Sequence, residues 1–351
     1  MNNLQVSERT SGNPFRRIIP KGTSLSPKLL RLLNSFEETL AQNIENIKPE
    51  NRGNGLTLSW MRSAIESLSA IHADVKDLIT ALELPISAWD DKWINVYLDN
   101  SVKLLDICIA FSSEISRLKQ GHLFLHSALH NLTDQIQIHR ACSSLAGWRQ
   151  HISSKNPRLE KCFSIMDSLA RMLDLPKIKN SSKGKVLMRA LYGIKVVTLF
   201  ICSVFAAALS GSSAPLIEVN VPSSYFWSKA FTNLQTSINT EIRSGYLSGG
   251  FTVLKEAVAV DMFVKQVYPI IENGFDPDEV DMLLSRKADL QGSVEELSLG
   301  LDSLAKEMDG FFQVVLTGRD ALLCNLRVVG VNVIDRVRAD GDGNRRGQVV
   351  R

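Results

Sequence analysis

Three histidines are the first residues whose type and spacing suggest chemistry. His122, His126 and His130 recur at every fourth position, so a helix would place all three imidazoles on one face. Imidazole is a common zinc ligand, but the outer two would lie about 12 Å apart along the helix axis, too far to share one ion. The spacing therefore predicts a polar helix face and no metal site.

A second candidate is a calcium loop near the C-terminus. Asp340-Gly-Asp342-Gly-Asn344 matches the start of an EF-hand loop. Such a loop requires glycine at its sixth position and glutamate at its twelfth, where this chain has Arg345 and Arg351. We therefore predict no calcium site and, more generally, no bound metal and no cofactor.

The compact signatures of catalysis are also missing from the sequence. It contains no P-loop, GxGxxG, GxSxG, CxxC or HExxH motif, so nothing nominates a nucleophile or a general base. We predict that the protein is not an enzyme; the alternative is an enzyme whose scattered residues act on a small hydrophobic metabolite held in its core. Five widely spaced cysteines in apolar helical contexts predict reduced, buried thiols: Cys108, Cys142, Cys162, Cys202 and Cys324.

A change from basic to apolar sequence marks the middle of the chain. From Arg140 to Lys195 there are twelve Lys or Arg against three Asp or Glu, and Val196–Leu209 then carries no charge. This order is typical of a chain that meets a membrane with its positive side in the cytoplasm, and equally of a buried central helix in a large bundle. The candidate membrane segment is defined by Ala190, Lys195, Val196, Phe200, Phe205 and Leu209.

That apolar segment is short for a membrane span. Its fourteen uncharged residues would form about 21 Å of helix, against a hydrocarbon core of about 30 Å. Extension back to Ala190 takes in Lys195, and extension forward meets Pro215. Three interpretations stay open: a spanning helix with the first 190 residues in the cytoplasm, a buried bundle helix, and a peripheral membrane contact.

Four lysines beside this segment form the candidate contact with an anionic membrane. Lys177, Lys179, Lys183 and Lys185 fall within nine residues. On an anionic leaflet each would be attracted to lipid headgroups, and the alternative is an ordinary solvated linker. The net charge of the whole chain is only +3, so no nucleic-acid partner is predicted.

Helical periodicity runs through nearly the whole chain, so helix packing must position these residues. Ser26-Pro27 and Asn156-Pro157 predict helix starts, whereas Gly121 predicts a helix break. Apolar residues in the last helix alternate in steps of three and four: Leu290, Val294, Leu297, Leu301, Leu304, Met308, Phe311 and Val315. We interpret them as a seam inside an intramolecular bundle; the alternative is self-association as a coiled coil.

The predicted fold class is therefore all-α, a large bundle of long antiparallel helices that includes one buried or membrane-embedded apolar helix. We divide the chain into a flexible N-terminus (1–24), an N-terminal helical bundle (25–175), a basic linker (176–184), an apolar helix with a C-terminal helical bundle and heptad helix (185–327), and a disordered tail (328–351).

Four segments resemble the plant BYPASS proteins: Asn13–Leu40 (NPFRRIIPKGTSLSPKLLRLLNSFEETL), Leu56–Leu68 (LTLSWMRSAIESL), Glu83–Leu125 and Phe311–Arg327 (FFQVVLTGRDALLCNLR). The resemblance covers about residues 13–327 and stops where the tail loses the heptad. It implies a plant protein without an enzymatic domain that acts in root and shoot development by restraining a root-derived mobile signal. The related ROH-like proteins are tied to exocyst subunits and hence to secretion. The family supplies no catalytic residues.

The predicted function is thus a non-enzymatic regulator that binds protein partners, with an exocyst-linked trafficking adaptor as the alternative. We expect it at the cytoplasmic face of endomembranes such as the endoplasmic reticulum, as a single-pass or peripheral protein. The first thirty residues contain one acid, Glu8, and several basic residues including Arg9, Arg16, Arg17 and Lys21, a composition typical of transit peptides. Cytosol and plastid are therefore the alternative locations.

Overall fold

The computed structural model describes residues 25–49, 56–83, 91–132, 138–173, 181–211, 216–247, 252–273 and 279–343. Within these ranges, side chains are described except at 91–93, 273, 279–285 and 324–343. The described chain is all-α, as predicted, and its one β-type pairing is an isolated bridge between Leu56 and Leu254. Its helices are α1 (Pro27–Asn46), α2 (Leu58–Leu82), α3 (Asp91–Asn131), α4 (Ile138–Ser153), α5 (Pro157–Arg171), α6 (Ser182–Ser210), α7 (Ser228–Leu247), α8 (Lys255–Asn273) and α9 (Glu279–Gly343).

Two helices begin with the capping residues that the sequence predicted. The Ser26 hydroxyl accepts a hydrogen bond from the Leu29 amide at 3.4 Å, and Pro27 opens α1. The Asn156 side chain accepts from the Arg158 amide at 3.0 Å ahead of α5. Both predicted starts are therefore confirmed, because a cap needs only neighbouring residues.

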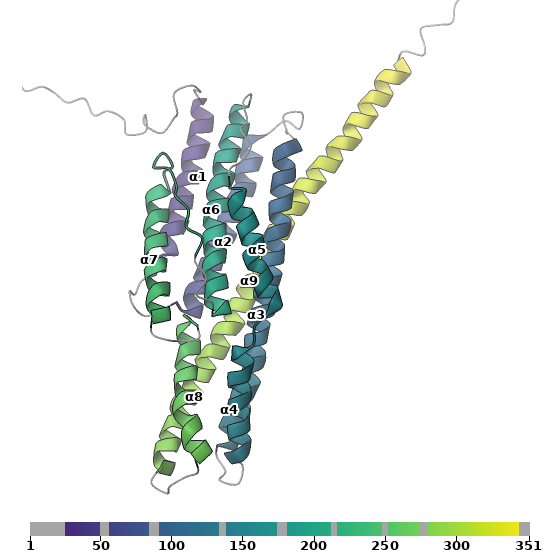
Figure 1. Cartoon of the computed structure of the whole chain (residues 1–351). Coiled ribbons are helices and arrows are strands. Elements are labelled where there is room, and N and C mark those ends of the chain that lie inside the picture. Colours follow the sequence, from purple (N-terminus) through teal and green to yellow (C-terminus); the bar gives the residue numbers. More distant parts are fainter. Residues whose placement is uncertain are drawn as a thin grey trace, which may run out of the picture.

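Two long helices, α3 and α9, run along the bundle, and the shorter helices pack around them (Figure 1). Helices α1, α2, α6 and α7 lie at one end, whereas α4 and α8 lie at the other. Lys119 of α3 pairs with Asp302 of α9, and Arg319 of α9 donates to the Leu98 carbonyl of α3. Residue numbers thus rise along α3 as they fall along α9, so this pair is antiparallel, as the sequence predicted.

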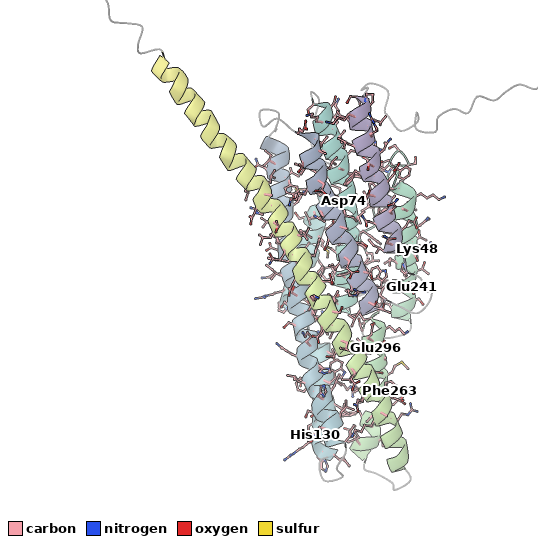
Figure 2. All side chains as sticks on the ribbon, turned by 180° about the vertical axis from the view of Figure 1, so that it is seen from behind. Lys48, Asp74, His130, Glu241, Phe263 and Glu296 are labelled. Carbon is pink, nitrogen blue, oxygen red and sulfur yellow. The ribbon has the colours of Figure 1, made fainter. Side chains whose placement is uncertain are left out.

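The apolar seam of α9 faces the interior. All eight seam residues, from Leu290 to Val315, are at most 4% exposed. Helix α9 packs against α2, α3 and α8, and Figure 2 shows it crossing the side of the bundle that faces away from the viewer in Figure 1. The prediction of an intramolecular seam is confirmed, since a seam that bound a second copy would have to be exposed.

The predicted boundary at 176–184 does not separate two independently packed halves. Helix α6 of the second half packs against α1, α2, α3 and α5 of the first, and one continuous core runs from Leu29 to Leu322. A polar linker marks a loop, and loops join helices inside one core as readily as they join domains.

Gly121 does not break its helix, contrary to the prediction, because α3 continues to Asn131. A Cβ atom at Gly121 would lie 2.7 Å from the Trp148 ring of α4. Glycine is thus used here for close helix packing and not for a turn.

The tail also differs from the prediction. Helix α9 continues to Gly343, so residues 328–343 are helical where we expected disorder. Extending an existing helix carries no nucleation cost, and this stretch contains no proline. This end of α9 projects beyond the bundle (Figure 1). The predicted flexible N-terminus and residues 344–351 lie outside the described residues.

Candidate functional site

Helix α6, which carries the candidate membrane segment, is the most enclosed helix of the bundle. It packs against α1, α2, α3, α5 and α7. The five uncharged candidates are at most 5% exposed: Ala190, Val196, Phe200, Phe205 and Leu209. Among the described residues it is the one helix long and apolar enough to cross a membrane, yet 89% of its apolar window is buried. Acyl chains could reach it only if the bundle opened, so the structure favours the buried-helix interpretation.

Lys195, the charge within the candidate segment, lies at the edge of this core. Its ammonium donates a hydrogen bond to the Met172 carbonyl at the end of α5. The pKa of Lys195 is lowered to about 8, chiefly by burial and also by the nearby charge of Lys103, while Asp99 acts in the opposite direction. Lys195 thus connects α6 to α5 within the protein.

Of the four lysines beside the segment, the two that the structure describes, Lys183 and Lys185, do not lie on one face. The Lys183 ammonium donates to the Glu83 carbonyl at 2.9 Å, which satisfies a carbonyl at the C-terminal end of α2. Lys185 follows two positions later on α6, and residues two apart on a helix do not face the same side. Lys177 and Lys179 lie outside the described residues.

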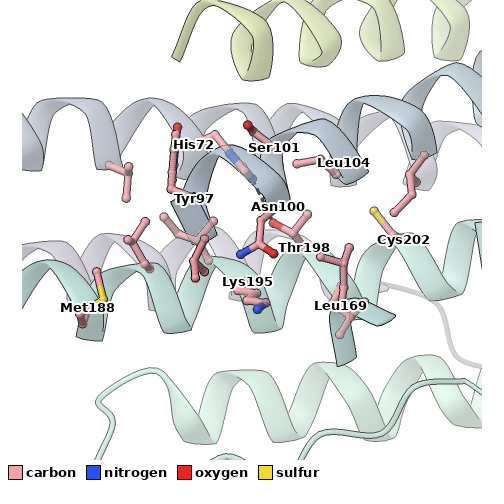
Figure 3. Close-up of a pocket in the computed structure, with 16 residues that line it drawn as sticks. His72, Tyr97, Asn100, Ser101, Leu104, Leu169, Met188, Lys195, Thr198 and Cys202 are labelled. Atoms are coloured by element: carbon pink, nitrogen blue, oxygen red, sulfur yellow. Dashed lines mark hydrogen bonds between the residues drawn. The ribbon is translucent and has the colours of Figure 1, made fainter. Parts of the chain in front are cut away.

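A cavity of about 90 Å³ lies between α2, α3, α5 and α6, beside the most buried part of α6. Most of its wall is aliphatic, and Figure 3 shows Met188 and Cys202 toward its two ends. The polar side chains that line it are His72, Tyr97, Asn100, Ser101, Lys195 and Thr198. A concave, mostly apolar space with a few convergent polar groups is the usual form of a small-molecule site.

His72 and Thr198 join two walls of this cavity. The His72 Nε2 atom lies 3.0 Å from the Thr198 hydroxyl, so α2 and α6 are hydrogen-bonded within an otherwise apolar layer (Figure 3). The imidazole also meets the ring of Phe311 on α9 edge-on, with centroids 5.3 Å apart. Burial lowers the pKa of His72 to about 4, so the ring is neutral at physiological pH.

The wall formed by α3 is connected to the last helix. Arg319 of α9 donates to the Leu98 carbonyl at 2.7 Å and to the Ser101 hydroxyl at 3.1 Å. Burial raises the pKa of Tyr97, which Arg319 opposes. The Oδ1 atom of Asn100 is buried and has no hydrogen-bond partner among the described groups.

The histidines on α3 do not form a metal site with other described residues. The rings of His122 and His126 are 4.3 Å apart, and burial followed by the His126 charge lowers the pKa of His122. Within the described ranges, no three His, Cys, Asp or Glu residues are arranged to hold a metal ion.

Three free thiols converge from separate helices in the core: Cys108, Cys162 and Cys202. Burial raises the pKa of Cys108 and that of Cys162 to about 12, and raises that of Cys202 as well. These three are therefore neutral thiols and weak nucleophiles. Cys142 is a free thiol that is only half-buried, and Cys324 is not described at side-chain level.

The cavity is not predicted by the sequence, although two residues of its lining carry a signal. His72 interrupts the apolar face Met61–Leu82 of α2, and Thr198 interrupts the run Val196–Leu209. A polar residue on an otherwise apolar helix face implies a buried partner. The identity of that partner could not be read from the sequence, because the two residues are 126 positions apart.

The fold and this site together define a class: an all-α bundle built around one buried apolar helix, with a small cavity beside it. The sequence model of the family described as Protein BPS1 matches residues 64–309. The chain is 52% identical to Protein BPS1, chloroplastic, of Arabidopsis thaliana over 92% of its own length and 91% of that protein. It is 37% identical to UPF0496 protein 4 of rice, in both the indica and japonica subspecies, over 90% of this chain and 94% of theirs. No solved structure matches.

The chain therefore belongs to the BPS1 family of plant proteins, which confirms the resemblance seen in the sequence.

Proposed function

We propose that this protein is a non-enzymatic regulator of root and shoot development that acts by binding partner proteins and restrains a root-derived mobile signal. Membership of the BPS1 family supports the developmental role. The observation that carries the binding role is a pair of exposed leucines on neighbouring helices. An exocyst-linked trafficking adaptor is the alternative, and the identity of the partner distinguishes the two.

The exposed leucines are Leu123 of α3 and Leu299 of α9, which are 69% and 70% exposed. Leu123 lies about one turn after Lys119, and Leu299 lies about one turn before Asp302. Lys119 and Asp302 form an ion pair between these antiparallel helices, so both leucines lie on the same side of it along the bundle. We call Leu123, Leu299 and this ion pair the leucine surface.

A groove lies on the same helix pair, farther along α3 toward its N-terminus. It is lined by Ile109, Ser116 and Gln120 of α3, by Phe312 and Asp309 of α9, and by Lys155 and Arg158 next to the start of α5. Gln120 is one turn from Leu123, so groove and leucine surface are close on α3. Apolar contacts with two basic side chains beside them suit an amphipathic helix with an acidic edge.

The test is to change the leucine surface without disturbing the core. Leu123→Glu combined with Leu299→Glu should leave the melting temperature nearly unchanged, because both side chains are already solvated. Proximity labelling in plant tissue should then show the labelling of specific partners reduced at least about tenfold, since hot-spot residues contribute about 2 kcal/mol or more. Phe226→Glu is the matched control, because Phe226 is 47% exposed but belongs to the α1 and α7 side of the bundle.

An unchanged partner set in the double variant would show that binding uses another face. A partner set made of vesicle-tethering proteins would favour the trafficking adaptor. A set of proteins that control growth or hormone responses would favour the developmental regulator.

For location, we propose a plastid or a membrane surface and no membrane-spanning helix. The name of the Arabidopsis relative places that protein in the chloroplast, and the basic, acid-poor start of this chain suits import. A surface contact through Lys177, Lys179, Lys183 and Lys185, at the cytoplasmic face of the endoplasmic reticulum or another endomembrane, is the second candidate. Changing all four lysines to Gln should release the protein from anionic vesicles only if that contact exists.

A further inference from the structure

The cavity between α2, α3, α5 and α6 has a mostly hydrocarbon interior. Val75, Leu104 and Leu199 line it from three different helices, together with Ile107, Leu169, Met188 and Ile194. Its volume of about 90 Å³ is of the same order as the engineered cavity of about 150 Å³ that takes up benzene. Its size therefore suits one ring or a short hydrocarbon chain.

One polar atom in this cavity lacks a partner. The Oδ1 atom of Asn100 is buried and accepts no hydrogen bond from any described group. Three polar groups of the lining are engaged with other groups, because His72 pairs with Thr198 and Ser101 pairs with Leu98 and Arg319. Since buried acceptors are almost always satisfied, a molecule in the cavity would gain a hydrogen bond by presenting a donor to Asn100.

The cavity offers no free charge to an ionic ligand. His72 is neutral at physiological pH, because its pKa is about 4. Lys195 is the remaining ionisable base in the lining, and its ammonium is held by the Met172 carbonyl. Nearby Lys103 is paired with Asp99 at 2.8 Å. Burying an unpaired ion here would be strongly unfavourable, so the occupant should be uncharged.

We propose that this cavity is a binding site for a small uncharged molecule with one ring or a short hydrocarbon chain and one hydroxyl, which donates its hydrogen bond to Asn100. The site is independent of the leucine surface, which lies elsewhere on α3 and α9. Arg319 of α9 donates a hydrogen bond to the Ser101 hydroxyl in the α3 wall of the cavity, so the cavity is also connected to the last helix.

The test uses phenol and benzene as probes of the full chain, with binding followed by methyl-labelled NMR titration. Phenol and benzene match in ring size, but only phenol has a donor. Wild-type protein should bind phenol about three- to tenfold more tightly than benzene, the effect of one net hydrogen bond. Asn100→Leu should remove this preference while it keeps benzene binding. The Leu123→Glu and Leu299→Glu double variant should bind both probes like the wild type.

The location of the probe is tested separately. Val75→Phe should fill the cavity and abolish saturable binding of both probes. If that variant fails to fold, the location of bound phenol is determined in the wild-type protein, from NOEs between the phenol ring and the methyl groups of Met188 and Ile107. Saturable binding with these NOEs supports the proposal. Absence of saturable binding, phenol NOEs to other methyl groups, or equal phenol binding by wild type and Asn100→Leu would overturn it.

Discussion

Glu37 of α1 and Arg189 of α6 form a two-pronged ion pair, with a buried carboxylate and a half-buried guanidinium, that joins the first helix of the bundle to its central helix. The Glu37 carboxylate also accepts a hydrogen bond from the Phe226 amide at 2.9 Å, next to the start of α7. The guanidinium lies over the Tyr225 ring at 4.5 Å from its centroid. Three segments that are distant in the sequence thus meet at one carboxylate.

Removal of this carboxylate should be strongly destabilising. Glu37→Ala leaves the Phe226 amide without its acceptor and Arg189 with only the Ser224 carbonyl. Because the guanidinium is partly exposed, we expect a loss of about 3 kcal/mol, the lower end of the range for breaking a buried pair from one side. Urea unfolding followed by circular dichroism measures the loss. Glu38→Ala is the matched control, because Glu38 is the exposed neighbour and its loss should change the unfolding free energy by less than about 0.5 kcal/mol. Equal effects of the two variants would show that the ion pair contributes nothing.

The prediction for α6 concerns membranes. Because most of its apolar window is buried by other helices, we expect alkaline carbonate to release the expressed full-length protein from membranes completely. The control is an ordinary single-pass protein in the same preparation, which should stay in the pellet. Retention of this protein in the pellet would mean that the bundle opens and α6 enters the bilayer.

The fold could be predicted from the sequence to the extent that its signals are local. Helix starts at Ser26 and Asn156 depend on neighbouring residues, and the seam of α9 depends on spacing alone. The helical state of residues 328–343 could not be predicted from the heptad. The end of the heptad indicates where α9 stops packing against other helices, whereas the helix itself can continue.

The candidate site could be predicted much less well, because it depends on pairings across the chain. Glu37 and Arg189 are 152 positions apart, and His72 and Thr198 are 126 apart. Composition identified α6 as apolar. It could not show whether lipid or other helices surround α6, and in the structure five helices do. The lysines next to it were close in sequence, yet Lys183 and Lys185 face different sides once the helix forms.

Two glycine variants distinguish the effect of close helix packing on stability from the effect of helix propensity. Gly121→Ala places a methyl group 2.7 Å from the Trp148 ring, and such overpacking should cost about 1–3 kcal/mol. Gly310→Ala meets nothing within 4 Å, so it should stabilise α9 by about 0.5–1 kcal/mol. Thermal unfolding measures both changes. A stabilising Gly121→Ala would show that α4 does not approach α3 this closely.

Variants in the seam of α9 test whether its buried leucines stabilise the folded chain or an oligomer. Leu297 and Leu304 are at most 3% exposed, and loss of one buried leucine costs about 2–5 kcal/mol even when alanine replaces it. Leu297→Asp combined with Leu304→Asp should therefore unfold the chain, as seen by circular dichroism. Leu299→Asp, on the solvated face between them, should not. A double variant that stays helical but changes its mass in light scattering would instead identify the seam as an oligomer interface.

The last prediction uses the titration of His72. Its pKa is about 4 in the folded protein and 6.5 as the ordinary value, so the unfolded chain binds more protons between these two pH values. Stability from the neutral ring is therefore complete above pH 6.5 and is lost as the pH falls toward 4. Between pH 7 and pH 5 this group alone should reduce the unfolding free energy by about 2 kcal/mol.

The matched variant is His72→Gln, which does not titrate and still offers a hydrogen-bonding group to Thr198. Urea unfolding at pH 7, 6 and 5 should show a shallower loss of stability in the variant than in the wild type. Parallel pH profiles for the two proteins would mean that the imidazole reaches solvent in the folded state and that the α2–α6 contact at Thr198 is open.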